Sequence, residues 1–179
     1  MKGVVFTEFL EMVEDRFGFE VADTIINDSD LESGGVYTAV GTYKHSEMVQ
    51  LVTQLSKQAG LSVPQLLKVY GNHLFTRFAA GYGQFFEKVD DGFDFLVQIE
   101  GYIHVEVRKL YPDAELPSFD TTRISENEME MIYTSERRMS DFAEGLIEGC
   151  ATHFNEQYTI TVEKLDPTGK QVKFNIVRA

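Results

Sequence analysis

The chain has 179 residues, 43% of them apolar, and a formal net charge of −13. This length suffices to bury one sizeable core, and the excess of acid disfavours nucleic acid and anionic lipid as partners. Cys150 is the only cysteine, which excludes internal disulfides and thiolate zinc clusters. No apolar run is long enough to span a membrane, and Glu8, Glu11 and Glu14 interrupt any secretory signal. We therefore expect a single-domain cytoplasmic protein.

The N-terminal half has the apolar spacing of helices. Gly18 and Gly60 are suited to ending two of them, and Ser62-Val63-Pro64-Gln65 has the residues of a helix start with a capping box. A longer apolar stretch follows and predicts a largely buried helix that contains His104. The predicted helices cover residues 4–17, 21–27, 46–58, 62–80 and 93–111.

From Phe119 onward, apolar residues alternate as they do in strands. We expect strands near 119–125, 128–136, 157–165 and 171–178, with a helix at about 139–154. Asp166-Pro167-Thr168-Gly169 is typical of a hairpin turn. The order predicts an α+β fold in which a helical N-terminal part precedes a four-stranded antiparallel sheet with flanking helices. One domain covers residues 1–179, with a soft division near 62–66 into subdomains 1–62 and 63–179.

Three hydrogen-bond donors continue one face of the second predicted strand. Met129 and Met131 are followed on that face by Tyr133, Ser135 and Arg137. Spread over about 13 Å of strand, a phenol, a hydroxyl and a guanidinium suit a ligand that carries carboxylates. An isolated Y-x-S-x-R match could equally be a polar strand end with a surface arginine.

Two residues upstream of this motif, a histidine and a proline, are notable for their order and spacing. His104 lies in the apolar helix, Pro117 follows thirteen residues later, and Tyr133 comes sixteen residues after that. Gly101, one turn before His104, would leave open space on the same helix face. Taken alone, His104 could be a hydrogen-bonded core residue and Pro117 a helix terminator. His45, His73 and His153 lack a comparable context.

Together, His104, Pro117 and the Y-x-S-x-R motif resemble the signature of the H-NOX family of haem-based gas sensors. The opening Met1-Lys2-Gly3 and the run from Gly145 to Gly149 also resemble that family. The resemblance implies haem b buried between the helices and the sheet. It further implies that His104 ligates iron, that Tyr133, Ser135 and Arg137 hold the propionates, and that Pro117 presses on the macrocycle.

The resemblance also implies which residues line the gas-binding side. Family members that hold O2 carry a tyrosine where this chain has Phe142, and a supporting amide where it has Leu74. We expect an apolar pocket that binds nitric oxide and CO but not O2, although apolar residues at this spacing could simply be core. The expected lining residues are Val5, Phe9, Leu74, Phe78, Phe142 and Leu146.

No catalytic motif stands out, and the sequence around Gly81-Tyr82-Gly83 lacks the strand-to-helix context of a phosphate loop. We therefore expect a non-enzymatic nitric oxide sensor in which gas binding weakens the iron–His104 bond and shifts the N-terminal helices. The resemblance implies a separate partner, either a histidine kinase or a cyclic-di-GMP enzyme. The alternatives are an O2- or CO-binding haem protein, and a haem-free α+β module that binds a lipid-like or carboxylate ligand at Arg137.

Overall fold

Four helices form the first part of the chain in the computed structural model, which describes residues 1–87 and 89–179. Gly18, with a φ of 92°, separates the first two helices, and Gly60, with a φ of 68°, ends the third in the left-handed conformation. The sequence predicted all four helices to within about two residues at most ends. They are α1 (Gly3–Phe17), α2 (Phe19–Asn27), α3 (His45–Ala59) and α4 (Val63–Gly81).

The start of α4 is defined by a capping box. The Ser62 hydroxyl accepts a hydrogen bond from the Gln65 amide, and the Gln65 side chain in turn accepts one from the Ser62 amide. Pro64 occupies the first turn, where its missing N–H has no helical partner to lose. This local arrangement confirms the start predicted from the sequence.

The remainder of the chain contains short helices and the sheet. The strands pair antiparallel in the order β1-β2-β4-β3, which confirms the predicted α+β class and the four-stranded antiparallel sheet. The elements are η1 (Gly83–Phe85), α5 (Gly92–Gln98), the π-helix η2 (Ile99–Ile103), α6 (His104–Leu110), β1 (Ser118–Arg123), β2 (Glu128–Thr134), α7 (Ser140–His153), β3 (Tyr158–Lys164) and β4 (Gln171–Arg178).

One face of the sheet is buried. Along β2 and β4 the side chains alternate between buried and partly exposed, as expected when only one face packs on a core. The predicted turn joins β3 and β4, with the Asp166 carboxylate accepting the Thr168 amide at 2.7 Å and Gly169 at a φ of 76°. The buried residues of the two strands are Met129, Met131, Tyr133, Val172, Phe174 and Ile176.

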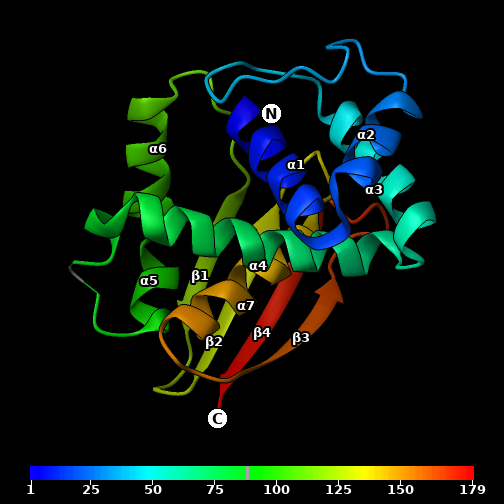
Figure 1. Cartoon of the computed structure of the whole chain (residues 1–179). Helices are drawn as coiled ribbons and strands as arrows, with labels where there is room; N and C mark the ends of the chain where they lie inside the picture. The colour runs from blue at the N-terminus through cyan, green and yellow to red at the C-terminus, as the bar shows by residue number, and fades with distance from the viewer. Residues whose placement is uncertain (88) are drawn as a thin grey trace.

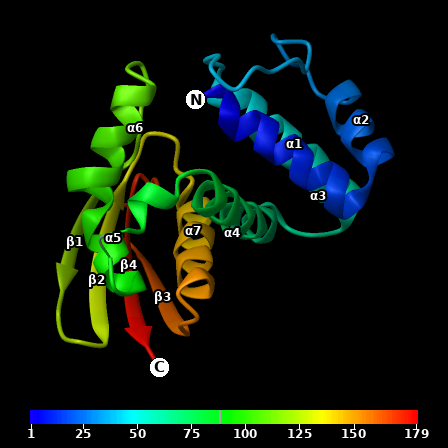
Figure 2. The same ribbon diagram turned by 60° about the vertical axis from the view of Figure 1, so that its left-hand side comes forward.

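Two hydrophobic clusters form the core, and α4 contributes to both. One cluster joins α1, α2 and α3 to α4 residues such as Leu66 and Tyr70, and the other joins the sheet, α5 and α7 to Phe75 of α4. Figure 2 shows α1–α3 on one side of the molecule and the sheet on the other, with α4 and α7 between them. The predicted division at residues 62–66 stays a prediction.

Helices α4 and α7 lie side by side (Figures 1 and 2) and approach each other closely at glycines. A Cβ atom on Gly145 would lie 2.1 Å from the Lys68 carbonyl oxygen, and one on Gly71 would lie 2.3 Å from the Phe142 carbonyl oxygen. Any larger side chain would therefore push the helices apart. Within the described residues, no helix combines the length and apolar character needed to cross a membrane.

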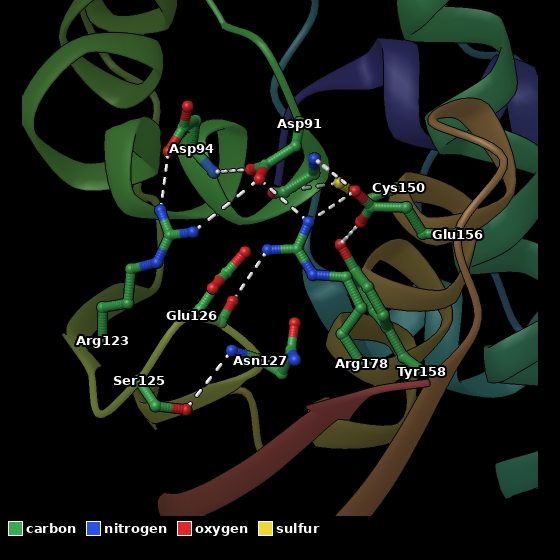
Figure 3. A network of polar contacts seen from close by, with 11 residues as sticks. Asp91, Asp94, Arg123, Ser125, Glu126, Asn127, Cys150, Glu156, Tyr158 and Arg178 are labelled. Atoms are coloured by element: carbon green, nitrogen blue, oxygen red, sulfur yellow. Dashed lines mark hydrogen bonds and ion pairs between the residues drawn. The ribbon is translucent and has the colours of Figure 1, made fainter.

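A polar network fixes the start of α5 (Figure 3). The Asp91 carboxylate caps the helix by accepting the Asp94 amide at 2.8 Å. Arg178 of β4 donates to both Asp91 and Glu156, at 2.8 Å in each case, and its guanidinium lies over the Phe93 ring. The first turn of the helical segment that leads to His104 is thus attached to the last strand.

Candidate functional site

A cavity of about 270 Å³ lies among α1, α4, the α5–α6 segment, α7 and the sheet. Its walls are mostly aliphatic and aromatic, and its polar groups come from a few side chains. Ten of the eleven residues singled out in the sequence line it. They are Val5, Leu74, Phe78, His104, Pro117, Tyr133, Ser135, Arg137, Phe142 and Leu146.

Phe9 is the exception, since it was predicted on the cavity wall and does not line the cavity. Phe9 is fully buried in the cluster of α1–α4, with its ring edge against Tyr70 at a centroid distance of 5.1 Å. One turn of α1 beyond Val5, the helix surface points into the packing with α4 rather than into the cavity.

His104 opens α6 and is buried, but the segment that carries it is not the single regular helix that was predicted. A π-helical turn, Ile99–Ile103, separates α5 from α6. The segment is also less buried than predicted, because Val97, Val105 and Leu110 are exposed. Such wide turns insert an extra residue into a helix and occur often at functional sites.

The π-helical turn changes the position of Gly101. A Cβ atom there would meet nothing within 4 Å, and Gly101 is exposed rather than part of the cavity wall. The space around Gly101 is open, as predicted, but Gly101 does not line the cavity, and its role towards a macrocycle stays a prediction.

One of the two imidazole nitrogens of His104 has a hydrogen-bond partner. Nδ1 lies 3.1 Å from Oε2 of Glu100, whereas no residue in the described part of the chain hydrogen-bonds to Nε2. Burial lowers the pKa of His104, although the Glu100 carboxylate opposes that shift. The ring is thus favoured as neutral imidazole, the form that ligates metals.

Tyr133, Ser135 and Arg137 all line the cavity, but not as three residues of a straight strand. Strand β2 ends at Thr134, and a turn follows in which the Ser135 hydroxyl accepts the Arg137 amide at 3.2 Å. Arg138 has a φ of 54°. The serine side chain competes with the ladder for the backbone, which ends the strand earlier than predicted.

Each of the two hydroxyls keeps its proton for another acceptor. The Tyr133 oxygen accepts the Met139 amide at 3.0 Å, and the Ser135 oxygen accepts the Arg137 amide, so both act as acceptors in these bonds. Tyr133 is 3% exposed. Both O–H groups therefore remain available to a ligand that carries a carboxylate.

Arg137 is held by the loop between α6 and β1. Its Nη1 donates to the Glu115 carbonyl at 2.7 Å and its Nη2 to the Glu115 carboxylate at 2.6 Å. Pro117, in the same loop, lies directly before β1 and lines the cavity. The guanidinium retains three further N–H groups for an anion.

Sequence reasoning missed several lining residues. Phe75, Phe85, Phe86 and Phe95 form an aromatic wall, with the rings of Phe86 and Phe95 stacked at 4.7 Å. Phe85 and Phe86 follow the glycines after α4, where periodicity gives no signal. Glu115 and Glu100 were also missed, because their partners Arg137 and His104 became visible only in the fold.

A haem-nitric-oxide-binding family model matches residues 2–162 of the chain. The chain belongs to the haem-NO-binding family. The resemblance read from the residues is thereby confirmed, and with it the assignment to a family of haem-based gas sensors. No curated protein matches the chain.

Solved structures of H-NOX proteins share the fold over the whole chain. The Fe(II) unliganded protein from K. algicida is 46% identical, with a TM-score of 0.95 over 100% of this chain and 97% of that one. The Fe(II)NO protein from S. oneidensis is 27% identical, with a TM-score of 0.92 over 100% and 99%. The IWP-051-bound Fe(II)CO protein from Shewanella woodyi is 42% identical, with a TM-score of 0.85 over 100% and 95%.

Proposed function

We propose that this protein is a haem-based sensor that binds nitric oxide and CO at ferrous haem b and rejects O2. One observation carries the proposal: a buried histidine and three carboxylate-binding donors lie on the same apolar cavity. The donor set suits haem, which needs an axial imidazole, apolar walls and partners for two propionates. Relatives with the same fold bind NO and CO at Fe(II).

His104 would hold the iron through Nε2, since its Nδ1 is already committed to Glu100. Tyr133 and Ser135 would each donate an O–H to a propionate, and Arg137 would add a charge-assisted contact. Pro117 would bear on the macrocycle from the same wall as His104, with a rigid ring that cannot donate a hydrogen bond. When bound, haem would supply a ferrous iron that can bind a diatomic gas.

The preference among gases would come from the other wall of the cavity. Val5, Leu74 and Phe142 present only hydrocarbon there. The nearby Tyr70 is fully buried and its hydroxyl already donates to the Val5 carbonyl, so it is committed to another partner. Bound O2 gains from a hydrogen-bond donor, whereas NO and CO depend on one much less, so this wall favours NO and CO.

His104 is the residue through which a signal would leave the site, because it would hold the haem from the start of α6. A change in that hold would alter the constraint on α6 and on the loop that follows it, which contacts Lys2, directly before α1, and Arg137, after β2. This gives a two-state element that the ligand biases. We propose that a separate protein reads the change, either a histidine kinase or a cyclic-di-GMP enzyme, as the family resemblance implies.

Replacement of the proposed ligand tests the proposal. We expect purified protein to show a Soret band and a five-coordinate ferrous spectrum with histidine as the axial ligand. His104→Gly should bind haem only when imidazole is added, while His45→Gly, outside the cavity, should retain the original spectrum. An unchanged spectrum in His104→Gly would refute the ligand assignment. Absence of a Soret band after haem supplementation would refute the sensor and favour a haem-free ligand-binding module.

A further inference from the structure

We propose that Glu100 is a positioning residue for the iron ligand, which sets both the tautomer of His104 and the strength of its bond to iron. This inference rests on the proposed haem function. It assigns a role to a carboxylate that belongs to neither the propionate site nor the gas-binding wall.

The geometry around Glu100 is that of a held carboxylate. Its Oε2 lies 3.1 Å from Nδ1 of His104 and accepts the backbone N–H of Phe119 at 3.2 Å. Its Oε1 lies 3.6 Å from Nη2 of Arg108. Three elements, η2, α6 and β1, therefore meet at one side chain.

The spacing along the chain brings Glu100 to this place, because it precedes His104 by four residues and residues four apart share one face of a helix. Glu100 belongs to the five-residue π-helical segment Ile99–Ile103, directly before His104 in α6. Gly101 in the same segment is exposed, so that the residue beside the imidazole is the glutamate and not the glycine. Since an irregular turn weakens the helix ladder, the two hydrogen bonds that Glu100 accepts offset part of that cost.

The chemistry of the pair determines the tautomer. A carboxylate only accepts hydrogen bonds, so Nδ1 of His104 must carry the proton and Nε2 must present its lone pair. An anionic acceptor behind a ligating imidazole orients the ring and raises its basicity, and removal of such a partner commonly reduces metal affinity by roughly 10–100-fold. Glu100 would therefore strengthen the bond between His104 and iron.

A stronger bond to His104 would raise the threshold for its release. The neighbouring cation moderates this effect, because Arg108 draws part of the carboxylate charge towards Oε1. Glu100 also connects the event to the sheet, since the oxygen that holds the imidazole holds the first residues of β1 through Phe119.

Glu100→Gln keeps the size of the side chain and removes its charge. In the ferrous protein we expect the iron–histidine stretching band in resonance Raman spectra to shift to lower frequency. Haem loss should accelerate by roughly tenfold or more, and a larger share of the NO complex should lack the histidine ligand. Glu106→Gln is the matched control. Glu106 lies on α6 with His104, but its carboxylate pairs with Lys109 and not with the imidazole.

A second measurement needs no haem. Nitrogen-15 shifts of the imidazole in haem-free protein should report a proton on Nδ1 in the original chain and a mixture of tautomers in Glu100→Ala. If Glu100→Gln and Glu106→Gln share the original stretching frequency while His104 still ligates iron, the role of Glu100 is wrong and the sensor proposal stands. If His104→Gly leaves the spectrum unchanged, the sensor proposal fails and the role of Glu100 fails with it.

Discussion

Arg137 is the residue at which loss of one side chain should weaken cofactor retention most. Its side chain is 15% exposed and lies beside the cavity, where a charged, bidentate contact to a carboxylate is poorly replaced by water. A hydrogen bond to a charged group contributes about 1.5–3 kcal/mol. We expect Arg137→Ala to accelerate haem loss by at least about tenfold, measured by transfer to an excess of apomyoglobin.

The neighbouring arginine provides the control for this measurement. Arg138 is exposed, and Arg138→Ala changes the net charge by the same amount. Equal rates of haem loss in the two variants would show that Arg137 acts only through surface charge, and the propionate assignment would be withdrawn.

Phe142 is the residue at which a single hydroxyl should alter the choice of gas. Its ring lines the cavity and stacks on Tyr70 at a centroid distance of 5.0 Å. Phe142→Tyr, alone or with Leu74→Asn to orient the hydroxyl, should increase O2 affinity. Because one hydrogen bond contributes about 1 kcal/mol net, we expect a gain of about fivefold, measured by oxygen titration of the ferrous protein.

Gas binding by the unmodified protein provides a second test of the proposed selectivity. In air its ferrous form should show no stable oxy spectrum, while NO and CO both bind. A stable oxy complex would mean that some donor reaches the gas-binding wall, and the proposed selectivity would then be abandoned.

At the scale of the elements, Arg178 connects β4 to the start of α5 (Figure 3). Arg178→Ala would remove the cation of Glu156 and the nearer of the two cations of Asp91, which would keep Arg123 at 3.7 Å. We expect a loss of about 2 kcal/mol, less than for a fully buried pair because both carboxylates retain some exposure. Thermal unfolding should then shift down by about 4–8 °C. Lys173→Ala, which removes a pair on the outer face of the sheet, should change it little.

The same network predicts that the stability of the protein decreases at low pH. Burial alone would raise the pKa of Asp91, but hydrogen bonds from the Asp94 amide and Arg178 lower it below its ordinary value of 3.8. A carboxyl with a lowered pKa contributes stability above its unfolded-state pKa, and this contribution is lost as the pH falls through the folded-state value. Between about pH 5 and about pH 3, unfolding curves of the original chain should therefore lose more stability than those of Arg178→Ala.

At the scale of the whole molecule, the 111–117 loop joins the segment that carries His104 to the N-terminal helices. Asp113 accepts hydrogen bonds from Lys2 at 3.0 Å and from the Thr42 hydroxyl at 2.7 Å. Lys2 directly precedes α1, whose first amide, that of Gly3, donates to Gly41. A displacement of α6 would thus reach α1 through Asp113.

Asp113→Asn should weaken this connection while leaving haem binding intact. We expect gas binding to change amide hydrogen exchange in the first turn of α1 in the original chain, and to change it much less in the variant. Asp120→Asn makes the same charge change on an exposed position of β1 and should behave like the original chain. If the exchange response in Asp113→Asn equals that of the control, the movement reaches α1 by another route.

The sequence by itself determined the order and type of most elements and the family of the protein, but not the π-helical turn before His104. Signals such as the Ser62 capping box and the Asp166 turn act over a few residues, so they are readable without any tertiary contact. The motif from Tyr133 to Arg137 was readable for the same reason. Its three side chains lie within five residues of one another, so they stay close in space even though β2 ends at Thr134.

Only the tertiary structure decided how these parts meet. The π-helical turn before His104, the early end of β2 at Ser135 and the burial of Phe9 against Tyr70 all depend on packing between segments distant along the chain. So does the pairing of Glu115 with Arg137, which are 22 residues apart. Periodicity reports which face of an element is apolar, but the partner of that face is chosen by three-dimensional packing, because burial and shape act between segments irrespective of their distance in sequence.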